Sequence, residues 1–486
     1  MLRRFVCWCS VALIVFGRKY RDFAPLLWYN DIMLKFGKNN EVINEESVRA
    51  ILAGIRHGKN DERSMEELEG LARADGVEVL GTIVQSPEKI NTATLIGSGK
   101  VAELAQLCEN MEADTVIFNE ELTGMQLRNL ESEIGVRIID RTILILDIFA
   151  KRAVSAEGKL EVELAQLAYR MPRLTGFGRS LSRLGGGIGT RGPGEKQLET
   201  DRRHIRKRMD DIKKELAAAR KNRETQRSRR KKSGMPVVAL TGYTNAGKSA
   251  LMNRLIAESD RFSHSGTAAP ETEVSKLNEL FDESDPGDLT GRNVASYDML
   301  FATLDTAQRK ITPDGRHEYI LVDTVGFVSD LPHTLVDAFK ATLEEVVYAD
   351  LILEVVDASY DECAFHIETT GEVLKEIGAT GIDHVLVYNK IDIAGGELLP
   401  QVPGESVFVS AKTGENIDEL NRLITDRLFS DNVKCRLMIP FARGDAVSFV
   451  QERGEVIKVE YTSEGTVMEA ELSEADYGRV RQFDIG

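Results

Sequence analysis

Short apolar runs alternate with amphipathic stretches over residues 41–153. The runs VEVLGTIV, DTVIFN and VRIID have the length and the β-branched content of buried strands, and KVAELAQLCENM and LRNLESEI between them have helical periodicity. Strands that alternate with helices predict a parallel α/β layer. The turn IGSGK precedes the first of these helices, but Val101 follows Lys100 where a phosphate-binding loop needs Ser or Thr. We therefore interpret IGSGK as an ordinary glycine turn.

Two further stretches have apolar residues at helical spacing, and a break separates them. The two stripes predict long helices that form an antiparallel hairpin over residues 154–232. The second stripe is interrupted by Arg202. The first consists of Leu160, Leu164, Leu167 and Met171, and the second of Leu198, Ile205, Met209, Ile212, Leu216 and Ala219.

The break between the two helices is rich in glycine and arginine. Residues 173–194 hold eight glycines and no acidic residue, and residues 196–232 hold 16 Lys plus Arg against 6 Asp plus Glu, so 16 − 6 gives +10. One interpretation is a solvated helix with a flexible linker. The other is a surface that contacts a phosphate backbone, since glycine permits close approach and arginine pairs with phosphate. The candidate contacts are Arg173, Arg179, Arg183, Arg191 and Lys196.

Residues 233–430 form a third pattern, with the near-continuous apolar runs VVAL, YILVD, LILEVVD, HVLVYN and SVFVS between helical segments. Such runs are typical of a parallel sheet that is covered on both faces. Residues 431–486 contain the strand-like runs AVSFV, VIKVEY and TVMEAEL and one helix signal, which predict a small α+β domain. The fold class is thus a multidomain α/β protein.

Composition narrows the class of protein. The length of 486 residues suits about three domains. The net charge of −16 argues against a uniformly basic nucleic-acid binder, so the charge of the hairpin is local. Five cysteines without a CxxC pair fit a reducing compartment.

The first residues resemble a signal peptide in one respect only, a short apolar run after Arg3 and Arg4. The run is too short to span a bilayer comfortably, and we expect no membrane insertion. Met33 opens a stretch typical of a folded domain. Our hypothesis is that translation begins at Met33, so that residues 1–32 are an overlong start and the N-terminal domain covers 33–153. Peptides from upstream of Met33 in the native protein would contradict it.

The strand VVAL runs into GYTNAGKS, and the helical pattern ALMNRLI follows. This is the GxxxxGK[ST] motif in its strand–loop–helix context. Backbone amides of the loop wrap phosphates, Lys248 reaches the β- and γ-phosphates, and the Ser249 hydroxyl is a ligand for Mg²⁺. The predicted phosphate-loop residues are Gly242, Tyr243, Thr244, Asn245, Ala246, Gly247, Lys248 and Ser249.

Three more motifs follow at the ends of later strands. DTVGF places Asp323 to hold Mg²⁺ through water and Gly326 to meet the γ-phosphate, with Thr324 and Val325 between them. NKID and SAK follow the next strands, and the Asp of NKxD in GTPases accepts from the ring N1–H and the 2-amino group, a pair of adjacent donors that guanine has and adenine lacks. The sequence therefore predicts a site for GTP and GDP. The base-side residues are Asn389, Lys390, Asp392, Ser410, Ala411 and Lys412.

These motifs, with GFGRSLSRLGGGIGTRGPGEKQLETDRR in the hairpin and LFATLD before the DTVGF strand, resemble those of the HflX family of translation-factor-class GTPases from about residue 44 onward. The resemblance implies a cytoplasmic GTPase that binds the large ribosomal subunit, and separately we expect a monomer. It also implies that the hairpin contacts ribosomal RNA and that the protein separates stalled or idle ribosomes. LFATLD would be the first switch, which adds Phe301, Ala302, Thr303, Leu304 and Asp305 to the site, with Thr303 as a ligand of Mg²⁺.

The sequence departs from the family pattern at two places. From Ser249 to Thr303 is 303 − 249 = 54 positions, a longer stretch than the resemblance predicts, and residues 268–293 read as an acidic, disordered insertion. The first switch reads TLDTAQR, which leaves Thr306 as a rival of Thr303 for the metal.

Hydrolysis should be slow in the isolated protein. Phe327 follows Gly326, so the Gln that orients water in Ras-like enzymes is missing, and Lys248 and Thr303 are the candidate transition-state stabilisers. Asn245 resembles the Asn that recruits K⁺ in related GTPases; the alternative is that Asn245 braces its own loop.

The alternative function of the whole protein is a non-catalytic ribosome-binding or hibernation module with GTP only as a ligand. Another alternative is a G protein whose hairpin serves protein assembly or a membrane surface.

Overall fold

The computed structural model describes residues 48–56, 61–86, 90–173, 193–233, 235–264, 301, 307–329, 340–360, 363–394 and 404–486. They belong to one compact unit that begins at Val48. Several predictions concern other residues: the doubtful start 1–32, the acidic insertion 268–293, the hairpin-tip residues Arg179, Arg183 and Arg191, and the switch residues Ala302, Thr303, Leu304, Asp305 and Thr306. All of these lie outside the described residues.

The N-terminal domain contains a parallel sheet in the order β2-β1-β3-β4, as the alternation of strands and helices predicts. Helices α3 and α6 contribute to the core on one face, and α4 and α5 to the core on the other. The strands are β1 (Arg49–Ile55), β2 (Glu78–Gln85), β3 (Thr115–Phe118) and β4 (Arg137–Asp140). The helices are α3 (Asp61–Ala74), α4 (Ser98–Met111), α5 (Gly124–Ile134) and α6 (Arg141–Arg152).

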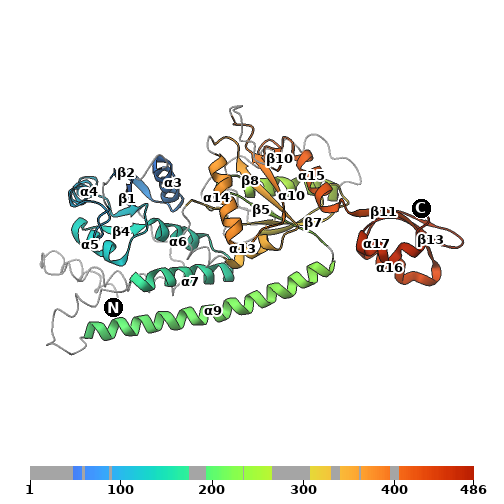
Figure 1. Cartoon of the computed structure of the whole chain (residues 1–486), viewed down its shortest axis with the longest axis horizontal. Helices are drawn as coiled ribbons and strands as arrows, with labels where there is room; N and C mark the ends of the chain where they lie inside the picture. The colour runs from blue at the N-terminus through green and yellow to red at the C-terminus, as the bar shows by residue number, and fades with distance from the viewer. Residues whose placement is uncertain are drawn as a thin grey trace, which may run out of the picture. The chain divides into compact units, whose positions relative to one another are not determined.

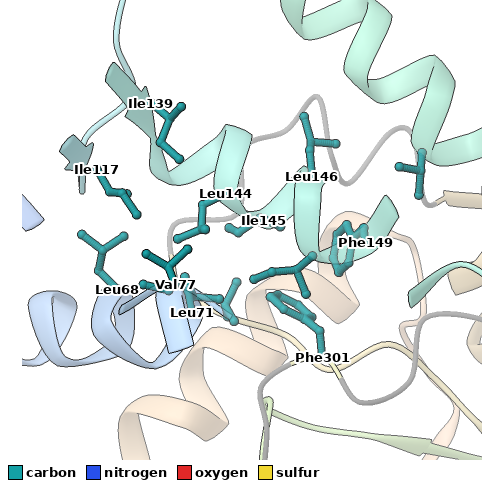
Figure 2. Packing of buried hydrophobic residues seen from close by; sticks show 14 of the residues in the cluster. Leu68, Leu71, Val77, Ile117, Ile139, Leu144, Ile145, Leu146, Phe149 and Phe301 are labelled. Atoms are coloured by element: carbon teal, nitrogen blue, oxygen red, sulfur yellow. The ribbon is translucent and has the colours of Figure 1, made fainter. Parts of the chain in front are cut away.

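Figure 2 shows the core on the α3 and α6 face, where leucines of both helices meet Ile117 and Ile139 of the sheet. Successive strand residues point to opposite faces, so Ile117 faces these helices while its neighbours Val116 and Phe118 join the other core. Burial on both faces explains why the strand sequences are almost continuously apolar.

The hairpin consists of α7 (Ala156–Arg173) and α9 (Pro193–Ser233), which lie side by side in Figure 1. On α9 the buried residues Ile205 and Ile212 belong to the predicted stripe. On α7 the fully buried face differs from the predicted one: Val162, Ala165 and Tyr169 pack into the N-terminal core, and the predicted leucines are only half-buried. The reason is that α7 contacts α6 as well as α9.

Ion pairs hold α9 against its neighbours. Arg208 forms a bidentate pair with Glu163 of α7, with nitrogen to oxygen distances of 2.7 and 2.6 Å. Arg227 donates to Glu345 at 2.9 Å, which joins the far end of α9 to α13 (Lys340–Val347) of the third domain. Part of the positive charge of α9 is thus neutralised within the protein.

The third domain, here the G domain, contains a six-stranded sheet in the order β10-β9-β8-β5-β7-β6 among the described residues. The five predicted strands are parallel, and β6 is antiparallel to β7. The strands are β5 (Val237–Thr241), β6 (Ala307–Ile311), β7 (Tyr319–Asp323), β8 (Leu351–Asp357), β9 (Asp383–Asn389) and β10 (Glu405–Phe408). The remaining helices are α10 (Lys248–His264), α14 (Cys363–Glu376) and α15 (Ile417–Phe429).

The C-terminal domain is an antiparallel sheet in the order β11-β13-β12 with two short helices. Its elements are β11 (Asn432–Pro440), α16 (Gly444–Arg453), β12 (Glu455–Tyr461), β13 (Gly465–Ser473) and α17 (Glu474–Val480). The prediction that AVSFV is strand-like was wrong, because it lies in α16. Ala446 and Val450 are the buried residues of this helix, and their separation of one helical turn is a period that the short run did not reveal.

No helix of the described ranges combines the length and the apolar character that crossing a membrane requires.

Candidate nucleotide-binding site

Two glycines shape the phosphate-binding loop between β5 and α10. Gly242 has φ +136° and Gly247 has φ +90°, both in the region that favours glycine. A Cβ on Gly242 would lie 2.2 Å from the carbonyl oxygen of Val355, and one on Gly247 would lie 2.3 Å from Nδ2 of Asn389. The loop therefore packs so closely against β8 and β9 that only glycine fits at these positions.

Lys248 lies buried under this loop. Its ammonium donates to the carbonyl oxygens of Gly242 at 3.0 Å and Tyr243 at 2.8 Å. Burial lowers the pKa of Lys248 to about 8, and the nearby charge of Asp323 opposes the shift. An anionic ligand in the loop would favour the charged ammonium and raise that pKa again.

Ser249 and Asp323 form an oxygen-rich corner beside Lys248. The Ser249 hydroxyl donates to Oδ2 of Asp323 at 2.7 Å, and both side chains are buried. A hydroxyl in the first turn of α10 and a carboxylate at the carboxyl end of β7 fit the oxygen ligands that Mg²⁺ prefers. The structure therefore brings together the two described residues of the predicted magnesium site.

The DTVGF segment runs beside the phosphate loop. The backbone N–H of Phe327 donates to the Gly242 carbonyl at 3.1 Å, and the N–H of Thr244 donates to the Phe327 carbonyl at 2.7 Å. A Cβ on Gly326 would lie 2.9 Å from the Lys248 ammonium, so the backbone of Gly326 faces the phosphate end of the site. Thr324 and Val325 are buried and support the segment from within.

Phe327 points away from the site. It packs with Leu343 and Val373 in a small apolar cluster and is 1% exposed. An apolar ring there cannot orient a water molecule, and the slow intrinsic hydrolysis stays a prediction.

The predicted base-side residues come together at the ends of β9 and β10. Asn389 joins two loops, since Nδ2 donates to the Ala246 carbonyl at 3.0 Å and Oδ1 accepts from the Ala411 amide at 2.9 Å. The Ser410 hydroxyl donates to Asp392 at 2.7 Å, and Asp392 is exposed. Asp392 is thus held in one orientation while its carboxylate remains open to a ligand.

The two lysines of the base-side motifs differ in their surroundings. Lys390 has a left-handed backbone with φ +65°, and its ammonium pairs with Asp357 at 2.8 Å. Lys412 is exposed, and its carbonyl accepts a hydrogen bond from Arg254. Both lie beside the loops that would surround a base.

Asn245 has φ +62° and is exposed at the rim of the phosphate loop. No described residue forms a hydrogen bond with its side chain. The prediction that Asn245 recruits K⁺ stays a prediction, which turnover in KCl against NaCl would test.

Phe301 is the one described residue of the predicted first switch. Its side chain is 2% exposed and meets the ring of Phe149 edge-on, with 4.6 Å between the ring centroids. Figure 2 shows both rings in the same apolar core. The sequence places Phe301 in the nucleotide site, but its side chain packs in an apolar core, where burying an aromatic ring is favourable. Phe301 is therefore attached to the core of the N-terminal domain.

A polar cluster that the sequence did not single out joins the phosphate loop to the N-terminal domain. Glu67 of α3 accepts from the Tyr243 hydroxyl at 2.5 Å and from Arg141 of α6 at 2.7 Å, and it also accepts from the Ser329 hydroxyl. The Ser329 amide donates to the Tyr243 hydroxyl at 2.7 Å. The Tyr243 ring stacks on His366 with 3.8 Å between the centroids. Tyr243 therefore turns its side chain away from the phosphate side.

Arg254 is the second functional candidate that sequence reasoning missed. It lies on α10, is 1% exposed, and donates to the carbonyl oxygens of Ala411 at 3.0 Å and Lys412 at 2.6 Å. A signal was present: an arginine between Leu251 and Leu255 falls near the apolar face of the helix.

The candidate RNA contacts are described in part. Arg173 is engaged inside the protein: its guanidinium donates to the carbonyls of Leu122 and Tyr169 and to Glu121, at 3.1, 2.9 and 3.0 Å. These partners oppose the prediction that Arg173 contacts RNA. The backbone of Lys196 lies in the first turn of α9.

Three family profiles match the chain. The family profile "GTP-binding GTPase N-terminal" matches residues 62–150, and "GTP-binding GTPase Middle Region" matches residues 152–230. The profile "50S ribosome-binding GTPase" matches residues 287–390, a range that begins after the phosphate loop.

Curated relatives match over most of their length. A protein of Caldanaerobacter subterraneus named "GTPase HflX" is 44% identical over 460 residues, which are 94% of this chain and 97% of the relative. The "GTPase HflX" of Escherichia coli is 40% identical over 79% of this chain and 83% of its own length. Among solved structures, a GTP-binding protein from Sulfolobus solfataricus in complex with GDP is 24% identical, with a TM-score of 0.40, over 79% of this chain and 99% of that protein.

Proposed function

The chain belongs to the HflX family of GTPases, and we propose that it couples GTP binding and hydrolysis to association with the large ribosomal subunit. As a member of this family it is a GTP hydrolase. The observation that carries the proposal is the convergence of the phosphate loop, DTVGF, NKID and SAK at one edge of the G-domain sheet. The match of residues 287–390 to a ribosome-binding GTPase profile supports the choice of partner.

The described residues have distinct parts in hydrolysis. The Lys248 ammonium would leave the carbonyls of Gly242 and Tyr243 for the phosphate oxygens and stabilise the charge that spreads over them in the transition state. Ser249 and Asp323 are the residues that would hold Mg²⁺, which neutralises phosphate charge when bound. The Gly326 amide would meet the γ-phosphate, so the DTVGF segment would differ between the GTP and GDP states.

The ribosome would supply what the isolated protein lacks. Phosphoryl transfer depends on positioning and electrostatics, and Phe327 contributes neither to the attacking water. We infer that the protein acts in the cytoplasm. There, contact with the large subunit would order the switch segments and raise the rate of GTP hydrolysis. By linkage, a ribosome that binds one nucleotide state more tightly must raise the affinity for that nucleotide by the same factor.

The basic hairpin is the proposed RNA-binding element. Arg203, Arg206, Lys207 and Lys213 of α9 are exposed, whereas Arg223 and Arg227 face acidic residues of α7 and α13. The outward-facing charges are those available to a phosphate backbone, whose neutralisation makes binding strongly dependent on salt. Separation of ribosomes into subunits is the finer proposal, and it rests on the family resemblance.

The test measures hydrolysis and binding together. We expect phosphate release from GTP to rise at least about tenfold with purified large subunits, as is usual when a partner completes a GTPase site. We also expect cosedimentation in sucrose gradients with a non-hydrolysable GTP analogue but much less with GDP. Equal rates with and without subunits would contradict the coupling. If no GTP is hydrolysed in a single-turnover experiment, the result would favour the alternative function, a non-catalytic ribosome-binding module.

A further inference from the structure

Arg254 has no place in the four nucleotide motifs, yet among the described residues it is the largest fully buried side chain. Its guanidinium donates from Nε to the Ala411 carbonyl and from Nη2 to the Lys412 carbonyl, at 3.0 and 2.6 Å. Both acceptors are main-chain atoms of the SAK turn. The planar, forked guanidinium fixes two neighbouring carbonyls at once, which a lysine cannot do.

The same turn is held from its other side. The Ala411 amide donates to Asn389 at 2.9 Å, and the Thr413 amide donates to the Ser410 hydroxyl at 3.0 Å. Gly414, with φ +85°, closes the turn, and a Cβ there would lie 3.3 Å from Nη1 of Arg254. The absence of a side chain at this glycine makes room for the guanidinium.

The SAK turn orients Asp392, the residue that would recognise guanine. Ser410 is 0% exposed, and its hydroxyl donates to Oδ1 of Asp392 at 2.7 Å. A shift of the turn would move Ser410 and release the Asp392 carboxylate. Arg254 therefore reaches Asp392 through two steps, from the guanidinium to the turn and from the turn to the carboxylate.

Arg254 is also tied to the phosphate side of the site. It lies on α10, the helix that begins with Lys248 and Ser249. The buried residues Leu251, Met252 and Leu255 pack into the G-domain core and fix the rotation of this helix. The phosphate-binding residues and the support of the base-side turn are thus parts of one rigid element.

We propose that Arg254 is a positioning residue for guanine recognition, which holds the Ser410–Lys412 turn in place from the helix that binds the phosphates. Its loss should weaken the part of nucleotide binding that depends on the base. The inference rests on the proposed guanine-nucleotide site.

The test uses the full-length protein with Arg254→Met, which keeps the length of the side chain and removes its donors, and with Arg254→Lys as a milder change. Glu258 keeps a partner in both variants, because Arg261 pairs with it at 2.5 Å. We measure dissociation rates of fluorescent GDP and affinities for GDP and IDP, since hypoxanthine lacks the 2-amino group that Asp392 would accept from.

Arg254→Met should release GDP faster by on the order of tenfold, and Arg254→Lys by about threefold, as expected for two hydrogen bonds and for one. The preference for GDP over IDP should fall by a similar factor. Arg422→Met, an exposed arginine of α15 in the same domain, is the matched control and should behave as wild type.

The outcomes separate this inference from the proposed function. If the wild type fails to bind GDP, the proposed function itself is wrong. If the wild type binds and Arg254→Lys matches it in GDP release and in GDP preference over IDP, the positioning role is overturned. A weaker affinity with an unchanged preference would also overturn it, since that result indicates a general loss of stability. Should Arg254→Met fail to fold, Arg254→Lys decides the matter alone.

Discussion

The two parallel sheets differ at their carboxyl edges. In the N-terminal domain the polar side chains at this edge form hydrogen bonds within the domain, whereas in the G domain they remain available to a ligand. Glu120 accepts from the Ile55 amide at 2.7 Å, and Asp140 accepts from the amides of Leu122 and Ile143 at 3.0 Å each. In the G domain the corresponding edge carries the exposed Asp392 and the buried corner of Ser249 and Asp323.

The difference teaches that a parallel sheet with helices on both faces does not by itself make a nucleotide site. Ligands bind such sheets at their carboxyl edge, provided that the polar groups there remain available. In the N-terminal domain these groups cap its own loops and helices, while Glu67 and Arg141 form hydrogen bonds with Tyr243 and Ser329 of the G domain. Four predictions test this contrast.

Removing the phosphate-loop lysine should have the largest effect. Lys248→Ala should lower the rate of GTP hydrolysis by about 10²- to 10³-fold, because the transition-state charge loses a preorganised cation. Lys100→Ala, in the glycine turn of the N-terminal domain, is the control; Lys100 pairs with Glu103 at 3.0 Å on the surface, and its loss should leave the rate unchanged. Single-turnover phosphate release measures both. A loss in Lys100→Ala would show that the N-terminal edge also serves the nucleotide.

Replacing one aspartate at each sheet edge by alanine should separate an effect on folding stability from an effect on GDP binding. Asp140→Ala should cost about 3 kcal/mol, because the buried amides and Tyr169 that bond to this carboxylate lose their acceptor. Asp392→Ala should change stability by less than about 0.5 kcal/mol and weaken GDP binding. Hydrogen exchange of the β4 and α6 amides and GDP titration are the measurements. The contrast fails if Asp140→Ala weakens GDP binding as strongly as Asp392→Ala.

The contact between the two domains should have an intermediate effect. Tyr243→Phe removes the hydroxyl that donates to Glu67 and accepts from the Ser329 amide, and keeps the ring that stacks on His366. We expect a cost of about 1 kcal/mol, seen as faster hydrogen exchange in α3 and α6. Tyr348→Phe, on a ring that is 56% exposed, is the matched control. Unchanged exchange in both variants would mean that the cluster does not hold the domains together.

The smallest effect should come from the contact between the G domain and the C-terminal domain. Burial lowers the pKa of His317, but the hydrogen bond and charge of Asp314 and the carboxylates Glu455 and Glu471 outweigh it and raise the pKa overall. Arg316 lies next to this group and pairs with Glu455 at 3.8 Å.

The sign of the pH dependence follows from the raised pKa. The folded state binds the proton more tightly, so the contact stabilises fully below the unfolded pKa of about 6.5 and is lost as pH rises through the higher folded pKa. Between pH of about 6 and about 8.5, wild type should lose up to about 1 kcal/mol more stability than His317→Gln. Denaturant titration of both proteins at the two pH values tests this, and parallel losses would contradict it.

The contiguous motifs could be found from the sequence, because each one binds a ligand whose shape fixes its residues. The phosphate loop, DTVGF, NKID and SAK are such motifs, and the structure brings them to one edge. The parallel sheets were also predictable, since burial on both faces leaves continuous apolar runs. Strand β6 lies at the edge of the sheet, and it was missed because the three consecutive polar residues in AQRKI give neither an apolar run nor an alternating pattern.

The contacts between distant segments could not be predicted in the same way. Glu67 and Tyr243 are 176 positions apart, and Arg254 and Ala411 are 157 positions apart. No local pattern indicates such partners, since Glu67 reads as one more acidic residue of an amphipathic helix. Arg173 was grouped with the hairpin tip because it directly precedes the stretch rich in glycine and arginine. Its hydrogen bonds are with Leu122 and Glu121 of the N-terminal domain.

Helix α9 has 41 residues and is bound to α13 near its C-terminal end through Arg227 and Glu345. At 1.5 Å per residue, the stretch from Arg227 back to Pro193 is roughly 50 Å long. A tilt of only about 5° at the α13 end would therefore displace the Pro193 end by roughly 4 Å, more than the length of a hydrogen bond. A rearrangement of the G domain that tilts α9 together with its partner α7 would therefore become larger along the helix, toward the Pro193 end.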